Sequence, residues 1–186
     1  ELVEEMKKAG CEYIDLGIES GSNRILKNIK KNITVEQAVE AAKIIKKAGI
    51  GLKIFMMHGL PGETCEDIKK TVFLSRDLYC KVGVDGATQG ITLIYPGTEV
   101  ERIAKESGTF PRDFSWSKPY VRKRSYPPLT GPECMPIFEQ PNLSYEQVFR
   151  CVKKAKFAYF SRHPIYFLRT FWKYRTTIKS WLTTNV

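Results

Sequence analysis

Short apolar runs alternate with amphipathic stretches along the first half of this 186-residue chain, and this alternation limits the fold more than any other feature. The runs near 12–18, 50–57 and 87–95 predict strands, and helical patterns lie between them. The order strand, helix, strand, helix, strand is typical of a parallel sheet with right-handed crossovers. The near-continuous apolar runs predict strands that are buried on both faces. We therefore expect an α/β fold that forms part of a TIM-type (β/α) barrel.

Three strands are too few to close such a barrel, which takes roughly 250 residues. The chain begins at Glu1 rather than Met, in a stretch that already has a helical pattern. We therefore expect that earlier strands precede this chain in a longer protein. Without them, two sheet edges would be open, which predicts self-association through 12–18 or 87–95.

Capping signals predict where the helices begin and end. Each N-terminal signal is a Ser or Thr, in three of four cases followed three residues later by Gln or Glu, and glycine ends two of the helices. These residues are Thr34 with Gln37, Thr64, Thr98 with Glu101, Ser144 with Gln147, and the terminating Gly49 and Gly108.

Composition divides the chain into three parts. Residues 1–108 hold the predicted partial barrel. Residues 109–143 contain seven of the ten prolines and six aromatic residues, which is typical of a lid or of an irregular cover over the barrel floor. Residues 144–186 predict a helix to about Arg162 and a second helix from Pro164. From 145 onward there are nine Lys and Arg but one acidic residue, so this region carries +8 of the net charge of +10.

The cysteines indicate a reduced protein. There are five of them, none in a CxxC pair, and the chain shows no secretory leader. No apolar stretch is long enough to span a bilayer. These features favour a reduced protein of the cytoplasm.

Three strand ends predict a ligand site, because ligands of parallel α/β folds collect at the carboxyl ends of strands. The first end presents Glu19 and Ser20, although an isolated Glu here is also typical of a helix cap. The second is the turn GLPGET at 59–64, preceded by His58, which is more often a structural residue than a ligand contact. The third is LIYPGTE at 93–99. Spacing and composition do not name the ligand.

The stretch GIESGSNRILKNIKKNITVEQAVEAAKIIKKAGIGLKIFMMHGLPGET resembles the second half of the catalytic domain of radical S-adenosylmethionine (SAM) enzymes. It is most similar to the branch shared by methylthiotransferases and cobalamin-binding enzymes. The tail KFAYFSRHPIYFLR is similar to C-terminal helices of the cobalamin-binding branch, including the anaerobic cyclases of magnesium-protoporphyrin monomethyl ester. The resemblance covers about residues 1–108 and, less strongly, the tail.

The resemblance implies roles for matching residues. Glu19, with Ser20, would contact the ribose or methionine part of SAM. Lys31 would bind the methionine carboxylate, a position where the family often has Arg and for which Lys30 is a competitor. The remaining implied residues line the adenine or stabilise its turn: Met57, Gly59, Ile94 and Tyr95 at the adenine, and Glu63 in the turn.

The CxxxCxxC loop that holds the family's [4Fe–4S] cluster is absent from this chain, as is the segment that meets the SAM amino group. The resemblance therefore implies that both lie upstream, in the missing N-terminal half of the barrel. The full-length enzyme would cleave SAM reductively, with electrons from a flavodoxin or ferredoxin, and would start radical chemistry or, with cobalamin, methyl transfer. This chain alone would be inactive, and its substrate is not indicated.

Two other functions remain open. The chain could be a non-catalytic binding module whose basic, aromatic tail contacts RNA or an anionic membrane surface. It could also be a (β/α) lyase or aldolase, but the strand ends lack a Schiff-base lysine, since Lys53 lies in mid-strand. Packing of the tail helices on the barrel is the simpler interpretation of the tail.

Overall fold

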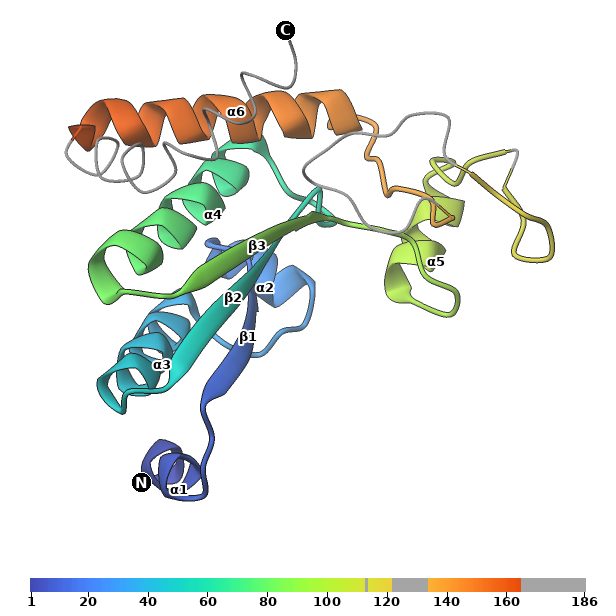
Figure 1. Ribbon diagram of the computed structural model, residues 1–186. Helices are drawn as coiled ribbons and strands as arrows, with labels where there is room; N and C mark the ends of the chain where they lie inside the picture. Colours follow the sequence, from blue (N-terminus) through green and yellow to red (C-terminus); the bar gives the residue numbers. More distant parts are fainter. Residues whose placement is uncertain (113, 122–133, 165–186) are drawn as a thin grey trace, which may run out of the picture.

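The computed structural model describes residues 1–112, 114–121 and 134–164, and within them the chain forms a three-stranded parallel sheet with helices (Figure 1). The sheet order is β1-β2-β3, with strands at Tyr13–Glu19, Gly51–His58 and Gly86–Ile91. The α-helices are α1 Leu2–Lys8, α2 Asn23–Asn28, α3 Val35–Lys47, α4 Cys65–Asp77, α5 Glu99–Glu106 and α6 Tyr145–Arg162, and a π-helical turn, Leu78–Val82, extends α4. The predicted α/β class and parallel strand order are confirmed.

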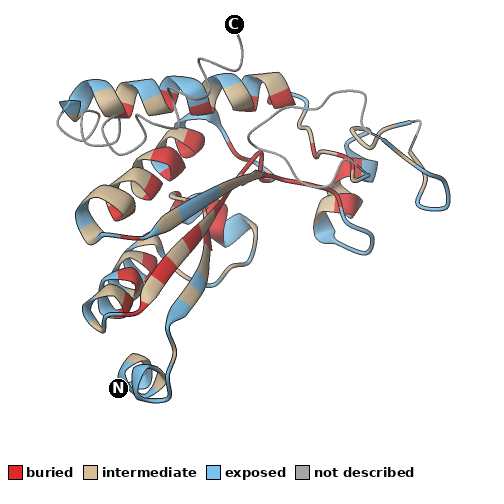
Figure 2. Cartoon of the chain, in the orientation of Figure 1, coloured by how far each residue is buried: buried red, intermediate tan, exposed pale blue. Residues whose placement is uncertain are grey.

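Helix α3 packs on one face of the sheet, and the described residues leave the other face uncovered. Along β2 the even-numbered residues are buried, whereas the odd-numbered ones are half-buried (Figure 2). Leu52, Ile54 and Met56 pack with Ala42 and Ile45 of α3 in one apolar cluster. The prediction that the strands are buried on both faces was therefore wrong for the described part of the chain, because covering residues are present on one side only.

The third strand is shorter than predicted. It ends at Ile91 rather than near Tyr95. Beyond it, Leu93 forms an antiparallel bridge with Ile137, and the Ile94 N–H donates to the Pro136 carbonyl at 2.9 Å. A segment more than 40 positions away replaces a neighbouring strand as the hydrogen-bonding partner, so no local pattern marks this strand end.

Part of the Pro-rich segment covers the end of the sheet. Phe138 is buried and packs with Ile94 and Ala104. Near 110–120, Phe114 makes edge-on ring contacts with Phe110, Trp116 and Tyr120. Tyr126, another aromatic residue of the Pro-rich segment, lies outside the described residues.

All four predicted helix caps form, and three of them have reciprocal hydrogen bonds. Thr34 with Gln37 and Ser144 with Gln147 make the predicted capping boxes, and Thr64 makes one with Asp67. At α5 the Thr98 hydroxyl accepts from the Glu101 N–H as predicted, but the Glu101 carboxylate accepts from Gly97 instead of returning to Thr98. Gly49 and Gly108, with φ of 71° and 68°, end α3 and α5 in the left-handed conformation that glycine favours.

Helix α6 lies across α4 as an outer layer (Figure 1). Val148, Val152 and Ala155 of α6 pack with Ile68 and Val72 of α4. Tyr159 is fully buried and donates its hydroxyl to Asp77 at 2.8 Å. The predicted helix from Pro164 lies, beyond Pro164 itself, outside the described residues.

A disulfide joins Cys65, the first residue of α4, to Cys151 of α6. The Cα atoms are 5.5 Å apart, within the normal disulfide range, and the cysteines are 86 positions apart in sequence. The expectation that all the cysteines are reduced was therefore wrong for this pair, whose proximity depends on helix packing.

Within the described residues, no helix has the length and apolar character to span a bilayer.

Candidate functional site

The three predicted strand exits lie at one edge of the sheet, because β1, β2 and β3 are adjacent and parallel. Glu19 ends β1 beside Met56 of β2, and His58 ends β2 beside Ile91 of β3. The register shifts between Gly17 and Glu19, and Glu19 has a φ of 72°, which is uncommon for a residue with a side chain. Bulges and strained backbone of this kind cluster at functional sites.

An ion pair joins the first exit to the loop after α2. The Lys31 ammonium lies 3.3 Å from Glu19 Oε1, and the two side chains are 34% and 20% exposed. Both groups therefore remain accessible to a ligand. Lys30, the competing candidate, is exposed and has a φ of 57°, so the structure brings Lys31 rather than Lys30 to Glu19.

Gly17 makes room for this pair. A Cβ atom at Gly17 would lie 2.6 Å from Glu19 Oε1 and 3.3 Å from Lys31 Nζ. The sequence predicts Gly17 only as part of a strand, because the close approach depends on the register shift between Gly17 and Glu19.

The turn after β2 is held by a buried carboxylate. Glu63 Oε2 accepts from the N–H groups of Gly59 at 2.5 Å and Leu60 at 3.2 Å. Burial raises the Glu63 pKa to about 8, although these two backbone donors act in the opposite direction. The role of Glu63 in stabilising the turn, implied by the resemblance, agrees with this geometry.

Two distant side chains also hold the turn. The Gln140 side chain accepts from the Gly62 N–H at 2.8 Å and donates to the Leu60 carbonyl at 3.0 Å. Arg24 of α2 donates to the Gly62 carbonyl at 2.9 Å. The turn is therefore fixed from three sides, which suits a surface against which a rigid ligand can lie.

Asp67 connects the first two exits. Its carboxylate accepts from Ser22 Oγ at 2.7 Å and from Thr64 Oγ1 at 2.6 Å, and it pairs with Arg24. Burial alone would raise the Asp67 pKa, but the hydrogen bonds from Thr64, Ser22 and Arg24 outweigh it and hold the pKa at about 2. Asp67 lies three residues after the predicted cap Thr64, and this spacing could have identified it, whereas Ser22 and Arg24 give no local signal.

His58 and Ser20 are directed away from the open site. His58 is fully buried, and its Nε2 lies 3.2 Å from Gln89 Oε1. Burial lowers the His58 pKa to about 4, so the ring is neutral, which fits the structural interpretation of this residue. Ser20 is also fully buried, with its hydroxyl 3.3 Å from Thr71 Oγ1 of α4 and accepting from the Ser22 N–H.

The other predicted site residues differ in whether a ligand could reach their side chains. Met57 is half-buried and alternates with the buried His58, so it lies on the uncovered face of the sheet. Ile94 is fully buried and its N–H is already bonded, whereas Tyr95 is 46% exposed. The Gly59 N–H is bonded to Glu63, and a Cβ at Gly59 would lie 3.2 Å from Ile91. Of the second and third exits, Met57 and Tyr95 therefore offer the accessible side chains.

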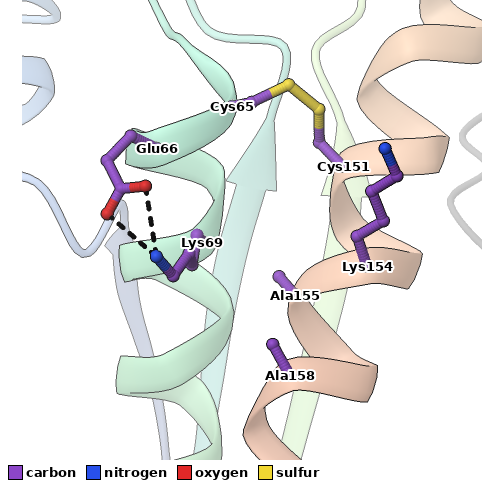
Figure 3. A pocket seen from close by; sticks show the side chains of 7 residues that line it. All are labelled: Cys65, Glu66, Lys69, Cys151, Lys154, Ala155 and Ala158. Atoms are coloured by element: carbon purple, nitrogen blue, oxygen red, sulfur yellow. Dashed lines mark hydrogen bonds and ion pairs between the residues drawn. A yellow bond between two sulfur atoms is a disulfide. The ribbon is translucent and has the colours of Figure 1, made fainter.

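A hollow of about 280 Å³ lies elsewhere, between α4 and α6 (Figure 3). Its lining residues are Cys65, Glu66, Lys69, Cys151, Lys154, Ala155 and Ala158. It contains none of the predicted site residues. No group of three or more His, Cys, Asp or Glu side chains is placed to hold a metal ion in the described parts of the chain.

Part of the chain is similar to known proteins. Residues 1–74 match the family described as the Radical SAM superfamily. An uncharacterized methyltransferase of Pyrococcus horikoshii is 29% identical over 160 residues, covering 86% of this chain and 31% of that protein. A tRNA-2-methylthio-N(6)-dimethylallyladenosine synthase of Clostridioides difficile is 34% identical over 105 residues, 55% of this chain and 20% of the synthase.

A solved structure is also similar, that of Elp3 from Methanocaldococcus infernus with an N-terminal deletion. It has a TM-score of 0.48 and 26% identity, and the match covers 56% of this chain and 24% of that one. The chain thus spans less than a third of the length of the relatives named.

Proposed function

We propose that this chain is the C-terminal portion of a radical SAM catalytic domain. The observation that carries the proposal is the accessible Glu19–Lys31 pair at the end of β1, inside the stretch that matches the Radical SAM superfamily. The fixed turn after β2 lies at the same edge of the sheet and adds a rigid second wall. The two partners offer a carboxylate and an ammonium group side by side, which suits a ligand with both charges, such as the amino-acid part of SAM.

Each residue would act by binding and positioning. Lys31 would donate to the methionine carboxylate of SAM, and Glu19 would accept from a ribose hydroxyl or an ammonium group. The backbone around Gly59 and the side chains of Met57 and Tyr95 would border the adenine. When bound, SAM and a [4Fe–4S] cluster would supply the radical chemistry, and the cluster ligands would come from the N-terminal half of the domain.

Association with cobalamin is supported by the resemblance of residues 156–169, and cobalt analysis of the full-length protein tests it. The aldolase alternative is less favoured, because the Lys53 ammonium lies 4.9 Å from the centre of the Phe55 ring within β2 rather than at a strand end.

The test is to purify the full-length protein without oxygen and to measure its binding of SAM by calorimetry under the same conditions. Replacing Lys31 by Ala removes a charge-assisted hydrogen bond, so we expect the Kd for SAM to rise by roughly tenfold to a hundredfold. The matched control is Lys30→Ala, which removes the same charge from the adjacent exposed position and leaves the Kd unchanged. Equal effects of the two substitutions, or no SAM binding by a protein with an intact iron–sulfur cluster, would overturn the proposal.

A further inference from the structure

The outward face of α6 combines positive charge with an exposed aromatic ring. Arg150, Lys153, Lys154 and Phe157 are all exposed and, at 100° per residue, lie within one stripe of the helix. We call this set the α6 basic face. The buried stripe of α6, which packs on α4 and the sheet, lies on the opposite side of the helix. The basic face therefore points outward from the outer layer of the molecule (Figure 2).

The charges of this face are not neutralised within the described part of the chain. No ion pair there involves Lys153 or Lys154, and Arg150 bonds only a backbone carbonyl, that of Glu146. By contrast, Lys43, Lys69 and Lys81 on other helices each pair with an acid of their own helix. The unpaired charges favour an anionic partner.

Phe157 gives this face an apolar centre. Its side chain is 77% exposed, the highest value among the large hydrophobic residues that the structure describes. Lys153 and Lys154 lie one turn before it, so the ring is bordered by ammonium groups. The Phe157 ring does not help to pack α6, because the buried contacts of this helix lie on its opposite side.

The sequence that follows favours lipid over RNA as the anionic partner. Residues 165–186 contain eleven large apolar or aromatic residues and four basic ones, with no acid. Aromatic and aliphatic residues mixed with Lys and Arg are typical of segments that lie in a membrane interface. Phosphate contacts to RNA need the cations but not the aliphatic residues.

We propose that the α6 basic face docks this protein on an anionic lipid surface, with the cations at the headgroups and Phe157 inserted between them. The inference is independent of the proposed function, since none of these residues belongs to the strand-end site. The hollow between α4 and α6 lies beside the same face, and Lys154 contributes to both.

Vesicle flotation of the intact protein tests this proposal, with phosphatidylcholine vesicles that contain 30% phosphatidylserine or none. We expect binding only to the anionic vesicles, and release at high salt. Lys153→Gln with Lys154→Gln should lower the partition coefficient by roughly thirtyfold, since each basic residue near the surface contributes about fivefold. Phe157→Ala should lower it by roughly tenfold.

The matched control is Lys27→Gln with Lys47→Gln, which removes the same charge from exposed positions on α2 and α3 and should change binding by less than twofold. Circular dichroism checks that each variant is folded. Equal binding to both kinds of vesicle, equal losses in the two double variants, or an unchanged Phe157→Ala variant would overturn the proposal. So would binding to a structured RNA through the same lysines without binding to vesicles.

Discussion

Gly17 leaves the space that the Glu19 carboxylate occupies beside Lys31, and this makes a substitution there informative. In Gly17→Ala the new methyl group would displace Glu19 Oε1, which lies at the end of a flexible side chain. We therefore expect a small loss of stability, about 1 kcal/mol or less, together with a roughly tenfold weaker SAM binding by the full-length protein. Urea unfolding and calorimetry measure the two effects.

Gly90→Ala is the matched control for this prediction. Gly90 lies in β3 beside Met57, and a Cβ there would meet nothing within 4 Å. The Gly90→Ala substitution should change neither the stability nor the affinity for SAM. If Gly17→Ala bound SAM normally, the Glu19–Lys31 pair would not be part of the binding site.

Glu63 predicts how stability depends on pH. Its folded pKa of about 8 lies above its ordinary value of 4.5, so the folded protein holds this proton more tightly than the unfolded chain. The stabilisation that Glu63 contributes is therefore fully present below pH 4.5 and is lost as the pH rises toward 8. His58 acts in the opposite sense between about 4 and 6.5, because its pKa is lowered. The window from 6.5 to 8 thus isolates Glu63.

In that window we expect the free energy of unfolding to fall by at most about 1.4 kcal/mol per pH unit. Glu63→Gln keeps an oxygen for the N–H groups of Gly59 and Leu60 but cannot titrate, so its stability should be nearly constant there. Urea unfolding at several pH values measures both proteins. Parallel curves for the two would show that Glu63 is not the titrating group.

The disulfide between α4 and α6 gives the prediction at the scale of elements. Reduction should loosen α6 from the sheet, because Cys65 and Cys151 close a long loop. We expect Cys151→Ser to lower the free energy of unfolding by about 2–4 kcal/mol in the absence of reductant. The unsubstituted protein, measured with dithiothreitol, should have the same free energy of unfolding as the variant.

A thiol count provides the direct check of this bond. Unfolded without reductant, the chain should show three free thiols, those of Cys11, Cys80 and Cys134. A count of five would contradict the bond. Cys80→Ser is the control, since it leaves the disulfide intact.

These elements show what a sequence can predict in this fold. The strand–helix alternation and the caps at Thr34, Thr64 and Ser144 depend on residues within a few positions of each other, and they were predicted correctly. The early end of β3, the disulfide and the contacts of Gln140 depend on partners 40 to 90 positions away. Local periodicity carries no information about such pairs.

The same limit applied to the candidate site. Glu19 and the turn at 59–64 were found because strand ends and Pro-Gly turns are local patterns. The sequence did not point to Asp67, Arg24 or Gln140, because each of them forms its hydrogen bonds with a part of the chain outside its own element. The resemblance to radical SAM enzymes added Lys31, and the structure places that residue next to Glu19.

At the scale of the whole molecule, the sheet has two unpaired edges. In the described residues β1 and β3 each pair only with β2, and Tyr13 and Ala87 on them are exposed. Open parallel edges offer N–H and C=O groups to another chain, so we expect this chain on its own to self-associate as its concentration rises. Light scattering measures the mass.

A lysine at the responsible edge should suppress that association, because edge charges oppose strand pairing. Tyr13→Lys tests the β1 edge and Ala87→Lys tests the β3 edge, and each serves as the control for the other. In a full-length protein whose earlier strands continue the sheet beside β1, Tyr13→Lys should instead destabilise the fold, since that edge would be paired. A chain that stays strictly monomeric at high concentration would show that these edges are not available for pairing.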